Sequence, residues 1–275
     1  MKISRILILL AFLLKLTATN ELIIKNVKCT KFDALIEAIR ILVKRALYQR
    51  YQMIHIMSAV SDEQDVNYKD LMSKFLVMIH ENYASRLDTL NNGSKFLYRV
   101  RQNSVIFLDK IQSFQSYLPT IQPEKYRFIG NFLFILVNGR IEEIEEIFIA
   151  MWHKNIYNVY VIFEDADEIP LITFLPFGNA SRCGDTSAQT VTRYRNGKFN
   201  NQSQLLSHKL KNLNQCPIRL ATYLDPGCFM TRTLKNGTVE LYGYRYEFMK
   251  AIADSLNYTN EIKIVKGILP WGVIT

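Results

Sequence analysis

Four cysteines are the residues whose spacing most directly suggests a chemistry, namely disulfide formation: Cys29, Cys183, Cys216 and Cys228. An even number of cysteines can pair completely in an oxidising compartment, and four of them permit three pairings. We favour a Cys183–Cys216 bridge, because it would close the polar segment 184–215 and tether it to the strand that follows. Such a cross-link stabilises a fold by about 2–4 kcal/mol in principle. The partners of Cys29 and Cys228 stay open.

Metal binding and catalysis lack a recognisable motif in the sequence. There is no C-x-x-C or H-x-x-x-H spacing for a metal, and no G-x-S-x-G, H-E-x-x-H, phosphate loop or G-x-G-x-x-G. The four histidines lie far apart, and the glutamates within 142–146 suit the solvated first turns of a helix better than an acid–base pair. We therefore expect no metal, no cofactor and no enzyme activity, with a triad assembled in space as the alternative.

The amino terminus has the layout of a secretory signal peptide. Lys2 and Arg5 precede the apolar run Ile6–Leu14, and small residues follow around Ala18, where we expect cleavage. An uncleaved anchor is the weaker alternative, because the run is far shorter than the ~20 residues that cross a bilayer and Lys15 interrupts it. The sequence therefore predicts entry into the secretory pathway.

Five N-x-[ST] sequons support the same route, because sugars on them would keep the modified loops at the surface. They fall at Asn92, Asn179, Asn201, Asn236 and Asn257. The basic residues are dispersed along the chain: the formal net charge is +9, and removal of the three basic residues within 1–18 leaves +6. A nucleic-acid partner is therefore not expected.

Alternating apolar periodicities predict an α/β layer in the first part of the chain. An apolar run at 132–137 is followed by helical spacing over 141–152, and VYVIF (159–163) resumes as a strand. This order is a β-α-β unit, which implies parallel strands with a right-handed crossover. Further helices are predicted at 31–47 and 68–82, and further strands at 52–57 and 104–109.

A second, smaller unit is predicted to begin near Cys216. The strand LITFLPFG (171–178) is predicted to be the last of the first unit, and the polar residues 179–215 to form a connector. A strand (218–224), a turn at Asp225-Pro226-Gly227, a turn at Asn236-Gly237, a helix (244–257) and a strand (261–265) follow. Such a short piece buries too little surface to be stable alone.

The second unit carries short motifs in a fixed order. They stand at Asp225-Pro226, Gly243-Tyr244, Glu247, Ile252-Ala253, Leu256-Asn257-Tyr258-Thr259 and Trp271-Gly272. With these motifs the unit resembles the first ligand-binding segment of ionotropic glutamate receptors, and more closely that of the divergent insect ionotropic receptors used in smell and taste. Residues 132–163 are also similar to the amino-terminal region of those receptors.

The resemblance implies an α/β fold in which a periplasmic-binding-protein-like region precedes the start of a glutamate-receptor-type ligand-binding lobe. Trp271, the aromatic before the glycine, would line the ligand cleft, where an indole face suits amines through cation–π contact; the alternative is an ordinary buried tryptophan. Asp225 would lie at the cleft rim, or serve only as a turn residue. The expected ligand is a small amine, acid or amino-acid-like molecule.

The resemblance also implies a function: the extracellular portion of a chemosensory ionotropic receptor, a ligand-gated cation channel subunit that joins co-receptor subunits in the plasma membrane. The family's ligand-carboxylate arginine, pore helices and second binding segment follow the aromatic-glycine pair, so we expect this chain to be a fragment. The alternative is a secreted soluble binding or interaction protein without channel activity. The expected division is a signal peptide (1–18), an amino-terminal extracellular domain (19–178), a polar connector (179–215) and an incomplete ligand-binding segment (216–275).

Overall fold

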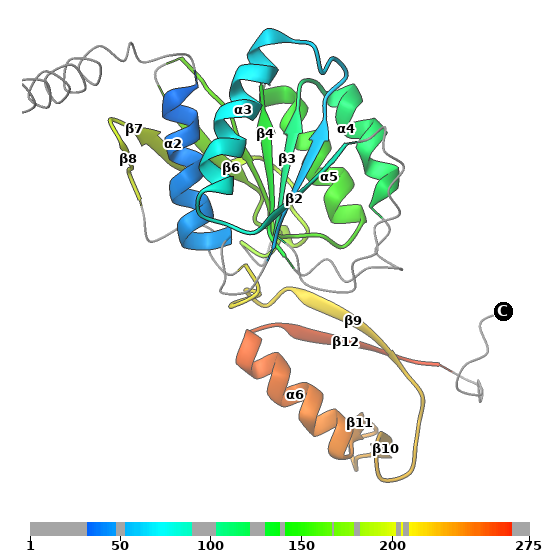
Figure 1. Cartoon of the computed structure of the whole chain (residues 1–275). Helices are drawn as coiled ribbons and strands as arrows, with labels where there is room; N and C mark the ends of the chain where they lie inside the picture. Colours follow the sequence, from blue (N-terminus) through cyan, green and yellow to red (C-terminus); the bar gives the residue numbers. More distant parts are fainter. Residues whose placement is uncertain are drawn as a thin grey trace, which may run out of the picture.

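The computed structural model contains a large α/β unit followed by a smaller one (Figure 1). It describes residues 32–47, 53–89, 103–121, 130–137, 141–166, 168–178, 182–201, 205 and 209–265. The larger unit, called the sheet unit below, is built on one eight-stranded mixed sheet. This confirms the predicted α/β fold class with a sheet of the periplasmic-binding-protein type.

The sheet has the strand order β2-β1-β3-β4-β5-β6-β7-β8. Neighbouring strands are parallel from β2 to β5, and antiparallel from β5 to β8. The strands are β1 (Ile54–Ala59), β2 (Ser85–Thr89), β3 (Asn103–Leu108), β4 (Phe132–Leu136), β5 (Val159–Ile162), β6 (Ile169–Thr173), β7 (Gln189–Arg195) and β8 (Lys198–Phe199). The predicted β-α-β unit is present, because β4 and β5 pair in parallel.

Helices cover both faces of the sheet. On one face, α2 (Asp33–Leu42), which continues as a π-helical turn over Val43–Leu47, packs beside α3 (Val66–His80). On the other face lie α4 (Ile111–Tyr117) and α5 (Ile141–His153). Every residue of β1, β3, β4, β5 and β6 is therefore buried, and most of these residues are apolar. The buried polar exceptions are His55, Ser58, Asn103, Ser104 and Thr173.

Alternate strand residues point to opposite faces and join separate cores. In β3, Phe107 belongs to the core under α2 and α3, where its ring meets Phe75 edge-to-face at 5.0 Å. Its neighbour Ile106 belongs to the core under α4 and α5, in which Phe114 meets Phe134 at 5.7 Å. Such aromatic pairs contribute about 0.5–1.5 kcal/mol each beyond the area that they bury.

The sheet continues beyond residue 178, where the sequence predicts its last strand, so that prediction is wrong. β7 and β8 lie within the predicted connector and extend the sheet from β6. Their polar residues face outward, while Thr192, Tyr194 and Phe199 are buried. In the sequence, this alternation resembles a polar connector. Asn196-Gly197 forms the hairpin turn with φ of 50° and 80°, and this dipeptide was the available signal.

The smaller unit, called the second unit below, follows the order that the sequence predicts and adds a hairpin. β9 (Pro217–Thr222) pairs in parallel with β12 (Thr259–Ile264), and α6 (Tyr244–Leu256) joins them. β10 (Met230–Thr233) and β11 (Val239–Tyr242) form the unpredicted hairpin. In Figure 1 this unit lies below the sheet unit, at the amino ends of the parallel strands.

A glycine is required where α6 begins. Gly243 has a φ of 117°, and a Cβ placed on it would lie 2.5 Å from the carbonyl oxygen of Cys228. A side chain at this position would push the helix away from the turn at 225–228. The glycine of the Gly243-Tyr244 motif is therefore required for steric reasons.

We predict that Phe248→Ser reduces self-association of the protein while leaving its thermal midpoint nearly unchanged. Phe248 is 67% exposed on α6, so its removal should change the free energy of unfolding by no more than about 0.5 kcal/mol. Ala253→Asp on the buried face of the same helix is the control and should cost more than about 2 kcal/mol. Light scattering and thermal melts measure both effects; a large fall in the midpoint of Phe248→Ser would contradict the exposed position.

Candidate functional site

The strand order changes direction between β1 and β3, since β2 lies on one side of β1 and β3 on the other. In open α/β sheets, ligands bind outside the carboxyl ends of the strands at such a point. Three polar side chains meet there, called the switch-point cluster below: Ser61 after β1, Asp109 after β3, and Ser113 in α4. The sequence predicts strand 104–109 but contains no motif that identifies the carboxylate at its end.

Asp109 is the centre of the switch-point cluster. Its Oδ2 accepts hydrogen bonds from the backbone N–H of Ser61, at 2.9 Å, and from the Ser61 hydroxyl. Its Oδ1 accepts a hydrogen bond from the Ser113 hydroxyl. Burial raises the pKa of Asp109, but these hydrogen bonds outweigh burial, so the pKa lies below its ordinary value. The cluster therefore holds a fixed negative charge at the carboxyl edge.

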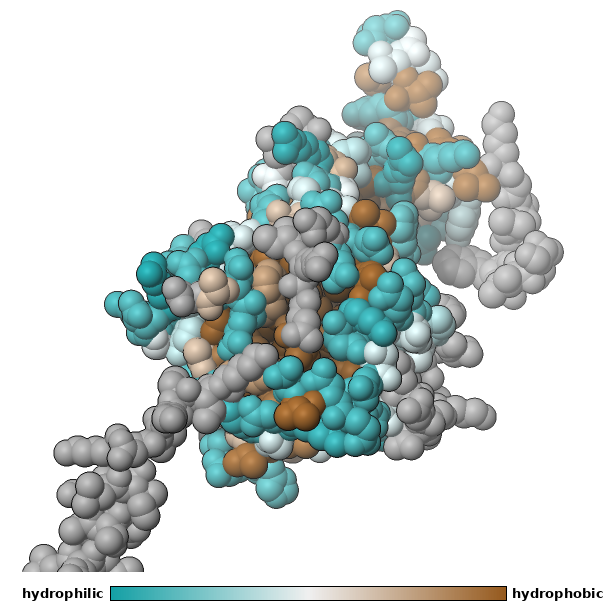
Figure 2. All heavy atoms as spheres, turned by 90° about the horizontal axis from the view of Figure 1, so that it is seen from above, coloured by the Kyte–Doolittle hydropathy of each residue, from teal (hydrophilic) through white to brown (hydrophobic). Residues whose placement is uncertain are grey.

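Further acidic residues follow the same ends of the strands. Asp62 and Glu63 come after β1, and Glu164 and Asp165 come after β5. Asp62, Glu63 and Asp165 are exposed. Figure 2 looks onto this edge from above, and hydrophilic residues cover much of the surface in view. Lys110 is exposed directly after Asp109, but the acidic residues named here outnumber it, so this edge favours a cationic group over an anionic one.

A pocket lies at the opposite edge of the sheet, between the sheet unit and the second unit. Its volume is about 490 Å³. Residues 175–178, which follow β6, form one wall, and Ser255 and Asn257 at the end of α6 form another. Four residues before β9 complete it: Lys209, Lys211, Asn212 and Asn214. We call this space the junction pocket.

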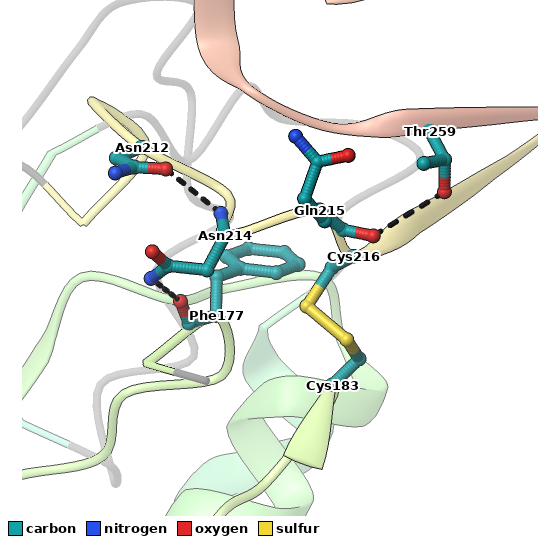
Figure 3. Close-up of a disulfide and its surroundings, with 7 residues drawn as sticks. All are labelled: Phe177, Cys183, Asn212, Asn214, Gln215, Cys216 and Thr259. Atoms are coloured by element: carbon teal, nitrogen blue, oxygen red, sulfur yellow. Dashed lines mark hydrogen bonds between the residues drawn. A yellow bond between two sulfur atoms is a disulfide. The ribbon is translucent and has the colours of Figure 1, made fainter. Parts of the chain in front are cut away.

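A disulfide holds the chain together beside this pocket. The structure joins Cys183 to Cys216, the pairing favoured from the sequence, with 5.6 Å between their Cα atoms (Figure 3). Near it, the side-chain amide of Asn214 donates a hydrogen bond to the carbonyl oxygen of Phe177 at 2.5 Å. The entry to β9 is therefore tied to the sheet unit by a covalent bond and by a hydrogen bond.

The same entry segment is hydrogen-bonded to the second unit. The backbone N–H of Leu213 donates to the carbonyl oxygen of Leu256 at 2.8 Å. The N–H of Gln215 donates to the carbonyl oxygen of Asn257 at 2.7 Å. The Thr259 hydroxyl donates to the Gln215 carbonyl oxygen at 3.3 Å (Figure 3). Residues 212–216 thus act as a clamp with one side on each unit.

Lys209 carries a buried ammonium group that the sequence gives no means to identify. Its side chain enters the sheet unit, and the residue is 8% exposed. The Nζ donates hydrogen bonds to the Tyr157 carbonyl oxygen and to the Thr173 hydroxyl, both at 2.6 Å. The Val159 carbonyl oxygen accepts a third at 3.4 Å. All three ammonium hydrogens therefore have acceptors within the protein.

No carboxylate forms an ion pair with Lys209 within the part of the chain that the structure describes. Instead, its Nζ lies 4.9 Å from the centre of the Tyr160 ring and 4.5 Å from that of Phe174. Burial lowers the pKa of Lys209 to about 7. Its charge is therefore sensitive to pH near neutrality.

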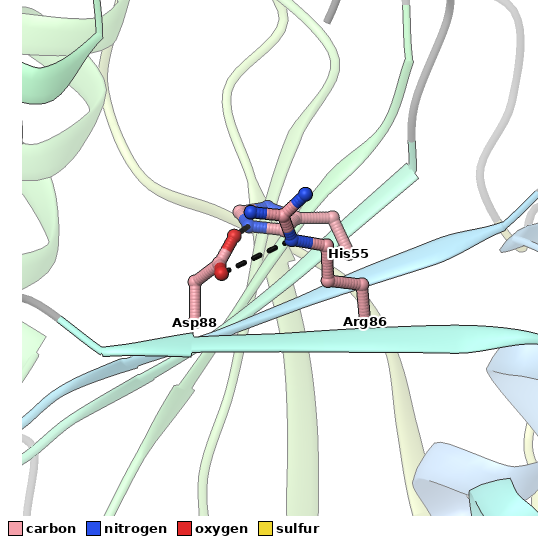
Figure 4. Close-up of polar contacts among 3 residues, drawn as sticks. All are labelled: His55, Arg86 and Asp88. Carbon is pink, nitrogen blue, oxygen red and sulfur yellow. Dashed lines mark hydrogen bonds and ion pairs between the residues drawn. The ribbon is translucent and has the colours of Figure 1, made fainter. Parts of the chain in front are cut away.

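A second buried charged group fixes the edge strand β2. The Nε2 of His55 lies 3.1 Å from one Asp88 oxygen, and the Nε of Arg86 lies 3.1 Å from the other (Figure 4). Burial lowers the pKa of His55 in spite of the hydrogen bond to Asp88. His55 stands near the amino end of β1, and its contact with Asp88 joins β1 to the edge strand β2.

The residues predicted to contact ligand are not brought together among the described residues. Trp271 lies outside them. Asp225 forms the turn before β10: its backbone exchanges hydrogen bonds with Phe229, and its carboxylate lies 3.8 Å from the Arg245 guanidinium. Asp225 does not line the junction pocket. Its role as a ligand contact stays a prediction.

The other predicted sites are also only partly described. Cys29, the signal peptide 1–18, and the sequons Asn92 and Asn179 lie outside the described residues. Asn236 is exposed at the tip of the β10–β11 hairpin, whereas Asn201 and Asn257 are half-buried. Glycosylation at these positions stays a prediction.

One comparison with known proteins identifies a family. The family described as "Putative ionotropic receptor, ligand binding domain" matches residues 27–212, about two thirds of the 275 residues. The matched range contains the whole eight-stranded sheet with the switch-point cluster. No curated protein matches the chain. Among the described helices, none is long and apolar enough to span a bilayer.

We predict that the Cys183→Ser, Cys216→Ser double variant unfolds at a lower temperature than the wild type. The bridge closes 33 residues, and its loss should cost about 3–4 kcal/mol in the chain-entropy description. Cys228→Ser is the control, because Cys228 forms no disulfide within the described residues. Thermal melts measure the cost, and non-reducing peptide mapping should recover residues 183 and 216 in one linked pair. Recovery of both as free thiols would contradict the bridge.

We predict that Lys209→Met removes a pH dependence of stability. The pKa of Lys209 is about 7 in the folded protein and about 10.4 in an unfolded chain. Between these values the unfolded state binds more protons, so the free energy of unfolding should rise as the pH is raised from 7 to 9. Denaturant titrations should show a steeper rise for the wild type than for Lys209→Met.

The exposed Lys211 provides the matched control for this pH dependence. Lys211→Met removes a lysine of equal charge from the same segment and should keep the slope of the wild type, because it leaves the buried Lys209 in place. Equal slopes for the wild type and Lys209→Met would show that the Lys209 ammonium is not titrated on folding.

Proposed function

Because the chain belongs to the ionotropic receptor ligand-binding domain family, we propose that it is part of a chemosensory receptor subunit whose cation channel opens when a small molecule binds. The chain itself supplies an extracellular ligand-binding portion of a receptor. Family membership carries this proposal, since the match covers the complete sheet. In this proposal the domain binds its ligand without transforming it, and co-receptor subunits complete the channel.

We place the ligand at the carboxyl edge of the sheet, over the switch-point cluster. This edge lies within the matched range, and the strand order changes direction there. The Asp109 carboxylate is held in place by Ser61 and Ser113, and hydrogen bonds keep it charged. No basic side chain forms an ion pair with Asp109 within the described residues, so its charge is available to a cationic ligand. The proposed ligand is therefore an amine.

We predict that Asp109→Asn weakens amine binding at least about tenfold, since a hydrogen bond between charged groups contributes about 1.5–3 kcal/mol. Thermal shift and calorimetry with a series of primary alkyl amines measure the effect, with primary alcohols of the same length as uncharged controls. Ser113→Ala removes a hydrogen bond to Asp109 but keeps the charge, so it should bind amines nearly as the wild type does. Comparison of Ser113→Ala with Asp109→Asn therefore distinguishes the effect of losing the charge from the effect of losing a hydrogen bond in the cluster.

Asp225→Asn distinguishes this location from the rim predicted from the sequence. If Asp225→Asn abolishes amine binding while Asp109→Asn does not, the ligand lies in the second unit and the location proposed above is wrong. In a receptor that carries this domain, expressed with co-receptor subunits, amines that bind should evoke cation currents. Asp109→Asn should raise the amine concentration required for half-maximal current; binding without any current would contradict the channel function.

A further inference from the structure

The junction pocket has a charge opposite to that of the carboxyl edge. Two of its lining residues are lysines, Lys209 and Lys211, and the residues that line it include no aspartate or glutamate. We propose that the junction pocket binds a small oxyanion, which bridges the clamp to the end of α6. This site is separate from the proposed amine site, because it lies at the other edge of the sheet.

The two lysines contribute in different ways. Lys209 is buried beneath the pocket and its hydrogen bonds go to the protein, so it acts on an anion through its electric field. Lys211 is exposed, and within the described part of the chain no carboxylate pairs with it. Its ammonium group is therefore available for direct contact with the anion.

The amide groups of the pocket present donors in excess of acceptors. The Oδ1 of Asn212 accepts hydrogen bonds from the Asn214 backbone N–H and from the Asn257 amide, both at 2.8 Å. These two donors fix the Asn212 amide so that its Nδ2 is left without an acceptor among the described residues. Asn214 uses one side-chain hydrogen on the Phe177 carbonyl oxygen and keeps the second. Unused N–H groups beside a cation are complementary to the oxygen atoms of an oxyanion.

The wall formed by residues 175–178 indicates which anions would fit the pocket. Leu175, Pro176 and Phe177 contribute apolar surface to the pocket. A volume of about 490 Å³ lies within the range of ordinary small-molecule sites. An organic carboxylate with a short alkyl chain would place its oxygens on the donors and its chain on this wall, whereas inorganic phosphate would use the donors alone.

An occupied pocket would add contacts among three segments that the clamp already joins. The anion would contact Lys211 and Asn212 in the chain before β9, the loop after β6, and Ser255 at the end of α6. Because these segments belong to both units, binding would stabilise their arrangement relative to each other. The site therefore offers a way for an anion to bias the position of the second unit.

The test is calorimetry on the whole chain, titrated with sodium butyrate, sodium acetate and inorganic phosphate at constant ionic strength. We expect saturable butyrate binding, weakened at least about tenfold by Lys211→Gln. Lys235→Gln removes an equal charge from an exposed position in the β10–β11 hairpin and is the matched control, which should bind butyrate as the wild type does. Asn212→Ala should also weaken binding, because it removes the unused amide donors.

The relative affinities for the three anions show which kind of anion occupies the pocket. Tighter binding of butyrate than of acetate and phosphate supports an organic carboxylate that uses the apolar wall, and phosphate binding as tight as that of butyrate supports the oxyanion site with free phosphate as its occupant. Absence of saturable heat with all three anions overturns the proposal. Equal weakening by Lys211→Gln and Lys235→Gln also overturns it, because the effect would then be one of overall charge. Asp109→Asn should leave the result unchanged, so the amine proposal can fail independently.

Discussion

Burial of both faces of the parallel strands is the constraint on which the rest of this structure depends. Helices α2 and α3 cover one face and α4 and α5 the other, so every side chain of β1, β3, β4 and β5 is enclosed by packing. Few positions within these strands can hold a solvated polar group. Solvent-accessible polar groups of this unit therefore lie mainly in the segments that leave the ends of the strands.

The two ends of the sheet differ in charge because different segments leave them. At the carboxyl edge, acidic residues follow β1, β3 and β5, and Asp109 is held by hydroxyl groups from two of these segments. At the amino edge, the chain before β9 returns across the sheet and buries the Lys209 ammonium against the carbonyl oxygens of β5 and its approach. Two sites of opposite charge at opposite edges of one sheet can bind chemically opposite groups without competition between them.

The clamp over residues 212–216 is the mechanical link in this arrangement. It is fixed to the sheet unit by the Cys183–Cys216 bridge and by Asn214, and to the second unit by backbone hydrogen bonds from Leu213 and Gln215. A rearrangement of the loop after β6 would therefore be carried to β9 through short, direct connections. Movement of one packed body against another through a few fixed contacts is a common basis of receptor conformational change.

Much of the architecture follows from the sequence itself. Continuous apolar runs such as 132–137 that alternate with helical spacing such as 141–152 indicate the α/β class and the parallel β4–β5 pair, because a strand, a helix and a strand in this order form a β-α-β unit. The receptor family is shown by the match to residues 27–212, which lie before the second unit, so the resemblance of residues 216–275 to a ligand-binding segment stays a prediction. The Cys183–Cys216 pairing could also be predicted from the sequence, since only these two cysteines flank the polar segment closely.

Tertiary structure alone decided which polar residues meet. β7 and β8 have outward-facing polar residues and join the sheet only because β6 offers a free edge, so local sequence could not distinguish them from a connector. Ser61 and Asp109 are 48 positions apart, and Lys209 is 36 positions from Thr173. Local periodicity says which residues form a strand or a helix, but contacts across such separations depend on strand order and on the path of the returning chain.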